Sequence, residues 1–145
     1  MNYQFLSNTR LFRGISMDEL EKMLTCFSVQ TKQYEKGSLI LRAGQTVSAI
    51  GLVLSGNITI ENNDLWGNRT VMDRLGAGAI FAESYALTPE EILMVDIVAN
   101  EPTEVLFLQT RTILNPCQKS CYSHRALLGN LLAISSQKNL HMSRH

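Results

Sequence analysis

Apolar and polar residues alternate with a period of two through the middle of the chain and follow a helical period towards both ends. From residue 27 to residue 108 the alternation predicts short strands, which glycines and polar clusters separate. Many short strands with regular turn signals are typical of an antiparallel sandwich or barrel, so we expect a mainly β fold. The predicted strands are Phe27–Tyr34, Leu39–Leu41, Ala49–Leu54, Asn57–Glu61, Thr70–Leu75, Met94–Ala99 and Glu104–Leu108.

A short helix is predicted before the strands. Ser16-Met-Asp-Glu19 has the pattern of a capping box, in which the serine oxygen accepts from the Glu19 amide. The apolar residues that follow recur at helical spacing and predict an amphipathic helix from about Met17 to Thr25. These residues are Leu20, Met23 and Leu24.

The chain returns to helix after the last strand. Thr110 can cap a short turn through Leu114, Pro116 interrupts it, and a long helix is expected from about Lys119 to Ser143. We place the domain boundary here, with a β domain over residues 1–116 and the helix over residues 117–145. Two segments, Asn62–Asp64 and Trp66–Asn68, are expected to form a polar loop between strands.

The apolar arc of the long helix is broader than packing on one small domain requires. A helix with two apolar edges can pack on its own domain and on a second helix, which predicts a homodimer. The alternative is a helix buried entirely in its own domain. The candidate interface residues are Leu127, Leu128, Leu131, Leu132 and Ser135.

The stretch from Arg74 to Val98 combines a strand, a glycine turn, a short helical segment, a loop and a strand. Gly76 and Gly78 predict tight turns, because glycine reaches positive φ without strain. Residues 82–87 favour one helical turn, which Pro89 ends. Such an arrangement can direct backbone N–H groups at an anion.

Composition describes an ordinary globular chain of 145 residues, with 45% hydrophobic and 18% charged residues and no net charge. Nothing in this balance indicates contact with a nucleic acid or a membrane surface, and no apolar run approaches the roughly 20 residues of a membrane helix. The N-terminus lacks a secretory pattern. Three cysteines, an odd number, predict a reduced cytoplasmic protein. They are Cys26, Cys117 and Cys121.

Catalysis and metal binding find little support. His124, His141 and His145 all follow the predicted strands, so we expect no histidine metal site inside the β domain. Cys117 and Cys121 form a C-x₃-C-x₂-H pattern with His124, which offers three soft ligands. The favoured interpretation is two ordinary thiols and a surface histidine, and therefore no metal. No nucleophile motif is present, so we expect no enzyme.

Four segments together resemble the cyclic nucleotide-binding domain, namely Tyr34–Ile40, Arg42–Gln45, Ile50–Ile58 and Arg74–Glu83. The long terminal helix resembles the dimerisation helix of the Crp/Fnr family of bacterial transcription regulators. The resemblance implies a jelly-roll-like β-roll, a double-stranded β-helix that senses a small-molecule effector and dimerises through the helix. It also implies that DNA is contacted only through a C-terminal winged helix that is absent from this chain.

The sequence departs from the family pattern where relatives bind phosphate. Nucleotide-binding relatives have Phe-Gly-Glu-Leu and then an arginine step that holds the cyclic phosphate. Here the first motif is Phe-Ala-Glu-Ser, residues 81–84, and Leu93-Met94 stand at the arginine step. Glu83 is kept, the residue that meets the ribose hydroxyl in relatives. We refer to the segments around residues 82–84 and 93–94 as the cradle.

Charge around the cradle is one-sided. Residues 75–110 contain no lysine or arginine, and a stretch with only acidic residues repels an anion. We therefore expect no cAMP binding and a less anionic effector of unknown identity. The acidic residues are Glu83, Glu90, Glu91, Asp96, Glu101 and Glu104.

The candidate effector contacts are Ala82, Glu83, Ser84, Leu93 and Met94. Each has a plainer interpretation: Glu83 as a structural carboxylate at the start of a helical turn, and Leu93 and Met94 as ordinary core residues. A different class of function also stays open, a dimerisation module with a closed pocket and no ligand.

Overall fold

A computed structural model describes residues 1–27, 29–88, 90–114 and 122–143. They form two compact units, Gln30–Thr110 and the combination of Met1–Val29 with Arg111–His145. The predicted boundary between residues 116 and 117 lies outside the described residues.

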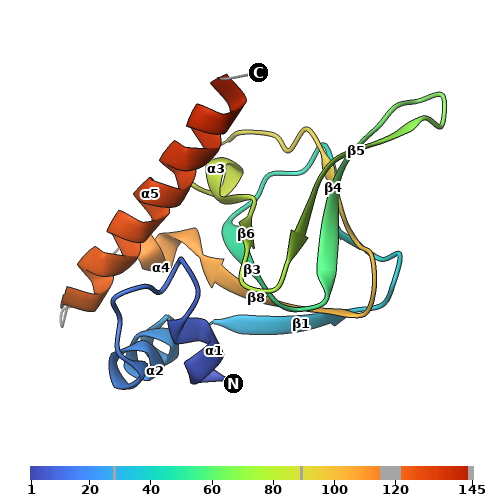
Figure 1. Ribbon diagram of the computed structural model, residues 1–145. Helices are drawn as coiled ribbons and strands as arrows, with labels where there is room; N and C mark the ends of the chain where they lie inside the picture. The colour runs from blue at the N-terminus through green and yellow to red at the C-terminus, as the bar shows by residue number, and fades with distance from the viewer. Residues whose placement is uncertain (28, 89, 115–121, 144–145) are drawn as a thin grey trace. The chain divides into compact units, whose positions relative to one another are not determined.

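The unit Gln30–Thr110 contains two antiparallel sheets of four strands each (Figure 1). The strand order is β1-β8-β3-β6 in one sheet and β2-β7-β4-β5 in the other, which confirms the mainly β, two-sheet fold. The strands are β1 (Gln30–Tyr34), β2 (Leu39–Leu41), β3 (Ala49–Ser55), β4 (Asn57–Asn63), β5 (Arg69–Gly76), β6 (Ile80–Phe81), β7 (Asp96–Ala99) and β8 (Thr103–Gln109).

All seven predicted strands are present, with ends that shift by at most three residues. β1 begins at Gln30 rather than Phe27, because the Phe27 N–H donates to the Met23 carbonyl and ends the preceding helix. Asn62 and Asn63, expected in a loop, pair instead with Thr70 and Arg69. Strand β6 has only two residues, too few for a periodic signal, and the sequence missed it.

The core of this unit lies between the two sheets, because its residues come from both. One sheet provides Val53, Phe81, Val105 and Phe107, and the other provides Ile40, Ile58, Ile97 and Ala99. The rings of Phe81 and Phe107 meet edge to face at 6.3 Å, a favourable geometry for two aromatic rings.

The tip of the β4–β5 hairpin is held by one carboxylate. Asp64 accepts hydrogen bonds of 2.9 Å from the backbone of Trp66, from the backbone of Asn68 and from the Asn68 side chain. Gly67 completes the turn at φ 84°. The turn presents Leu65 and Trp66 to solvent, and Trp66 is 86% exposed.

The second unit contains the helices at both ends of the chain. The helices are α1 (Tyr3–Ser7), α2 (Met17–Cys26) and α5 (Tyr122–Ser143), while α4 (Thr110–Leu114) joins the two units. Ser16 accepts from the Glu19 amide at 3.3 Å, which confirms the predicted cap of α2. The Thr110 hydroxyl donates to the Ser48 carbonyl instead of capping α4. Helix α1, capped by Asn2, was missed because five residues are too few for a periodic pattern.

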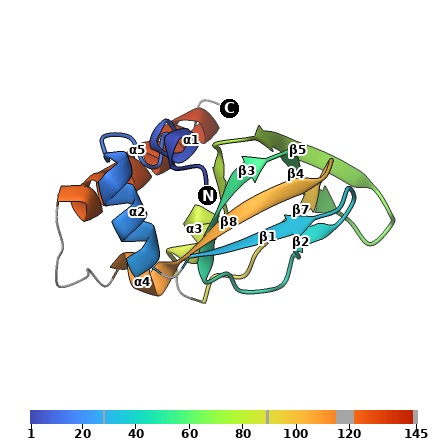
Figure 2. The same ribbon diagram turned by 90° about the horizontal axis from the view of Figure 1, so that it is seen from below.

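Helix α5 packs against the N-terminal segment of its own unit, and α2 lies beside it (Figure 2). The Asn130 side-chain amide donates to the carbonyls of Leu11 and Arg13, at 2.8 and 2.9 Å. About two helical turns further along α5, the Arg10 guanidinium donates to the Gln137 side chain. The predicted start of the helix at Lys119 lies outside the described residues. Among the residues that are described, no helix is long and apolar enough to cross a membrane.

One close contact fixes strand β6 on β3. A Cβ atom on Gly51 would lie 2.2 Å from Cζ of Phe81, so the Phe81 ring occupies the space that any larger residue at position 51 would need. Gly51 is needed because it lets the Phe81 ring approach the backbone of β3 closely, and not because of a positive φ.

We predict that Gly51→Ala lowers the free energy of unfolding by about 1–3 kcal/mol, because the methyl group overpacks the core. Gly76→Ala is the matched control, since nothing lies within 4 Å of its Cβ position. The control should change stability by less than about 0.5 kcal/mol. Urea unfolding measures both, and a Gly51→Ala protein as stable as the wild type would contradict the packing.

Candidate functional site

The segment after β6 turns abruptly into a single helical turn. Ala82 adopts a left-handed conformation at φ 63° and precedes α3 (Glu83–Ala86), which is shorter than the predicted 82–87. Upstream, Gly78 has φ 91°, as predicted for the tight turn, whereas Gly76 does not have a positive φ. The backbone therefore enters the left-handed region twice in this short segment, at Gly78 and at Ala82.

The three predicted contacts in this segment differ in exposure. Glu83 is buried, Ala82 is half-buried against the core, and Ser84 is exposed. The Ser84 carbonyl accepts from the Thr88 hydroxyl at 2.8 Å, which stabilises the end of the helical turn. A buried carboxylate and an exposed hydroxyl thus stand side by side at the start of α3.

Leu93 and Met94, the pair expected at the arginine step, separate in the structure. Leu93 is 1% exposed, whereas Met94 is 69% exposed. The Leu93 backbone is held by the loop between β2 and β3: its N–H donates to the Gln45 carbonyl and its carbonyl accepts from the Gly44 N–H. This attachment places Leu93 and Met94 outside the ladder of β7, which begins at Asp96 rather than at the predicted Met94.

The predicted interface residues of α5 also separate. Leu127 and Leu131 are buried within the single chain, Leu128 and Ser135 are half-buried, and Leu132 is 70% exposed. Leu132 is the exposed large apolar side chain among the described side chains of α5.

The structure describes only one member of the candidate cluster of soft ligands, His124. Cys117 and Cys121 lie outside the described residues. The expectation of a surface histidine is wrong, because His124 is buried and its ring meets Phe27 edge to face at 5.9 Å. Within the described part of the chain, no group of three or more histidine, cysteine or acidic residues could hold a metal ion.

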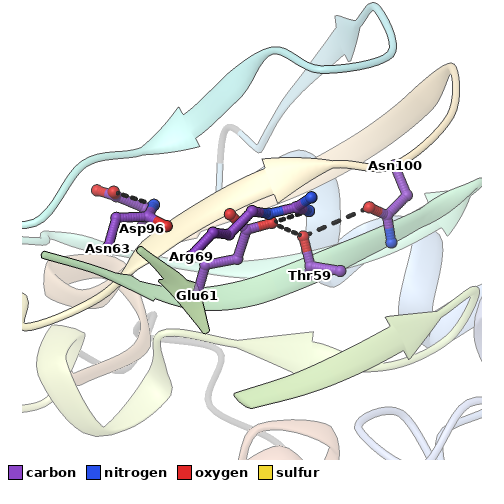
Figure 3. A network of polar contacts seen from close by, with 6 residues as sticks. All are labelled: Thr59, Glu61, Asn63, Arg69, Asp96 and Asn100. Carbon is purple, nitrogen blue, oxygen red and sulfur yellow. Dashed lines mark hydrogen bonds and ion pairs between the residues drawn. The ribbon is translucent and has the colours of Figure 1, made fainter. Parts of the chain in front are cut away.

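A network of polar side chains covers one face of the sheet β2-β7-β4-β5 (Figure 3). The buried carboxylate of Glu61 accepts from the Thr59 hydroxyl at 2.5 Å and from the Arg69 guanidinium. The guanidinium, together with the hydroxyl, holds the pKa of the Glu61 carboxyl below its usual range. Thr59 also lies 3.4 Å from Oδ1 of Asn100.

Asp96 extends this network to two other segments. One of its oxygens accepts from the Ala43 N–H and the other accepts from the Asn63 side chain, both at 2.8 Å. Thr59 and Glu61 lie two residues apart on β4, and both are buried. The register of β4 with β5 could not be predicted, because a bulge interrupts their pairing after Ile60. The only sequence signal for the ion pair with Glu61 was a basic residue, Arg69, on the other side of a turn rich in asparagine.

Comparison with known proteins identifies the family. Residues 31–120 match the family model of the cyclic nucleotide-binding domain. The chain belongs to this family. The resemblance stated from the sequence is thereby confirmed.

Among similar proteins, the cyclic AMP receptor protein of Thermus thermophilus is 31% identical over 103 residues. The match covers 71% of this chain and 46% of the receptor, so the cyclic nucleotide-binding domain described here spans about half the length of that curated relative.

Solved structures agree with the fold of the cyclic nucleotide-binding domain. The catabolite activator protein of Thermus thermophilus has a TM-score of 0.77 at 25% identity, over 93% of this chain and 60% of that one. A cyclic nucleotide-binding domain from Methylobacillus flagellatus has a TM-score of 0.78 at 17% identity, over 96% and 76%. The relatives are a receptor, an activator and a binding domain rather than enzymes.

The backbone of Ala82 is strained, because a non-glycine residue disfavours the left-handed region. We predict that Ala82→Gly raises the free energy of unfolding by about 0.5–1 kcal/mol. Ala77→Gly is the control, since Ala77 is exposed and has no positive φ, and it should not stabilise the domain. Thermal unfolding compares the two. A lower melting temperature for Ala82→Gly would show that the methyl group contributes more than the strain costs.

Proposed function

We propose that this chain is the effector-sensing and dimerisation domain of a Crp/Fnr-type transcription regulator whose effector is not cAMP. The observation that carries the proposal is Leu93, an apolar side chain that is 1% exposed at the position where nucleotide-binding relatives hold the phosphate with arginine. Membership of the cyclic nucleotide-binding domain family supports the sensing role. DNA contact belongs to a separate DNA-binding domain in this proposal, since these 145 residues have no net charge.

A bound phosphate loses affinity when its cationic partner is missing. Removing one partner of a buried, hydrogen-bonded charge pair costs about 2–5 kcal/mol. At 1.4 kcal/mol per decade, this cost corresponds to roughly 30- to several-thousand-fold in affinity. Residues 75–110 offer no lysine or arginine in place of the missing arginine.

The same features favour a neutral effector. Leu93 provides apolar surface, and Glu83 provides a carboxylate that accepts hydrogen bonds from hydroxyl or N–H groups. Ala82 and Ser84 flank the carboxylate, and the exposed Met94 would contact only the outer part of a ligand. A compound with hydroxyl or N–H groups, an apolar face and no phosphate fits this chemistry.

Sensing requires that the effector binds two conformations unequally. In our proposal, an effector on Ala82–Ser84 and Leu93 favours one arrangement of the β-roll and the terminal helix. The geometry of the dimer then changes, and with it that of the attached DNA-binding domains.

We predict that cAMP and cGMP leave the melting temperature of the chain unchanged, while a neutral compound from a metabolite panel raises it. A ligand at about 100 times its Kd adds about 2.7 kcal/mol, a shift of several degrees for a domain of this size. Glu83→Gln should reduce the shift, whereas Glu104→Gln, which contacts Gln33 away from the cradle, should not.

A clear shift with cAMP would contradict the proposal. If no compound in the panel shifts the melting temperature, the result favours the second candidate function. That function is a dimerisation module whose closed pocket holds no ligand. The buried Leu93 is the observation that favours this second candidate.

We propose that dimerisation uses the face of α5 that carries Leu132, since Leu127 and Leu131 are already buried in the single chain. Arg125, Gly129 and Ser136 share this face with Leu132, at spacings of three and four residues. The Cβ position of Gly129 has open space around it, which allows a second helix to approach closely.

We predict that the wild-type chain has twice the 16.2 kDa mass of one chain in light scattering after size exclusion, and that Leu132→Glu has the mass of one. Leu114→Glu is the matched control, because Leu114 is also an exposed leucine, on α4. The control should keep the dimer mass. A dimeric Leu132→Glu protein would overturn the assignment of this face.

A further inference from the structure

Asp96 joins three segments that are distant in sequence. It is the first residue of β7, and Figure 3 shows its hydrogen bond with Asn63. Oδ1 accepts from the Ala43 N–H in the loop between β2 and β3, at 2.8 Å. Oδ2 accepts from Asn63 at the base of the β4–β5 hairpin, also at 2.8 Å. A carboxylate provides both acceptors, whereas an asparagine amide would provide one oxygen and one donor.

The loop that Asp96 holds is also the loop that holds Leu93. The Gly44 N–H donates to the Leu93 carbonyl at 2.8 Å, and the Leu93 N–H donates to the Gln45 carbonyl at 2.9 Å. The loop is braced internally, because the Arg42 N–H donates to the Gln45 side chain. Leu93 and Asp96 therefore attach to one short rigid loop through adjacent residues.

The hairpin continues this connection outwards. Asn63 pairs with Arg69 at the end of the β4–β5 ladder, and the next residue is Asp64, whose carboxylate holds the turn. Asp64 therefore connects the base of the hairpin at Asn63 to the backbone of Trp66 and Asn68 at the exposed tip.

Asp96 stands directly opposite Glu61 in the pairing of β4 with β7. Like charges at directly opposed positions destabilise a sheet, so an acid at position 96 is costly unless its bonds offset the repulsion. Arg69 and Thr59 compensate Glu61, while the Ala43 N–H compensates Asp96. The Asn63 side chain donates to Asp96 and also helps to hold the pKa of Glu61 below its usual range, so the two acids share this amide. The link through Asp96 depends on its bonds to Ala43 and Asn63.

We propose that Asp96 couples the segment at Leu93 to the β4–β5 hairpin, so that a displacement of Leu93 repositions the tip that carries Leu65 and Trp66. Asp96 is a positioning residue in this device. The device rests on the proposed function only where it treats Leu93 as an effector contact. The coupling itself is a property of the ligand-free chain.

Hydrogen exchange of the ligand-free chain tests the coupling. Asp96→Ala should raise exchange about tenfold in two separate segments, residues 42–46 and residues 62–70, because each segment loses the hydrogen bond that it donates to Asp96. Asp73→Ala is the matched control, an exposed acid on β5 that accepts from the amide of its neighbour Arg74. It should leave both segments unchanged. Residues 104–108 in β8 report any global loss of stability.

A double-mutant cycle then tests whether the coupling between Leu93 and the hairpin runs through Asn63. Leu93→Val should raise exchange in residues 62–70 of the otherwise wild-type chain. In the Asn63→Ala background the hairpin already exchanges faster, and Leu93→Val should add nothing more there. Trp66, the only tryptophan, gives a second readout through its fluorescence anisotropy.

The proposal is overturned if Leu93→Val changes the hairpin equally in both backgrounds, or changes it in neither. An unchanged hairpin in Asp96→Ala overturns it as well. If Asp96→Ala does not fold, the Asn63→Ala cycle decides alone. No effector is used, so failure of this test leaves the proposed effector site standing, and failure of ligand binding leaves the coupling standing.

Discussion

The packing of Phe81 on Gly51 constrains the first segment of the cradle, residues 82–84. The ring takes the space that a side chain at position 51 would need, and this contact fixes the two-residue strand β6 on β3. The next residue, Ala82, must then turn through the left-handed region to begin α3. That turn places Glu83 among buried residues. A core contact between two sheet residues therefore determines where the carboxylate of the cradle lies.

The chemistry of the cradle follows from what surrounds this carboxylate. Electrostatic energies increase as water is excluded, so a buried carboxylate disfavours a second negative charge more strongly than an exposed one. In our proposal, Leu93, which the β2–β3 loop holds, stands where nucleotide-binding relatives provide a cation. The domain would then keep the fold of its family without the cation that a nucleotide phosphate requires.

Much of the β-roll could be predicted, because alternation and glycine turns report local structure directly. The cap of α2 and the ends of β2 are examples. The features that could not be predicted depend on tertiary context. Burial of Leu127 and Leu131 depends on which face of α5 is covered, and the burial of Glu61 depends on a bulged register with β5. The separation of Leu93 from Met94 depends on a loop about fifty residues earlier in the chain. Periodicity contains no information on such contacts.

Titration calorimetry with adenosine and with cAMP, in the same buffer and at the same salt concentration, shows whether this domain favours a cyclic phosphate. The two compounds share a base and a ribose and differ in the cyclic phosphate, so the ratio of their Kd values measures what the phosphate contributes. We expect cAMP to bind no more tightly than adenosine. A Kd for cAMP tenfold or more below that of adenosine, about 1.4 kcal/mol, would contradict it.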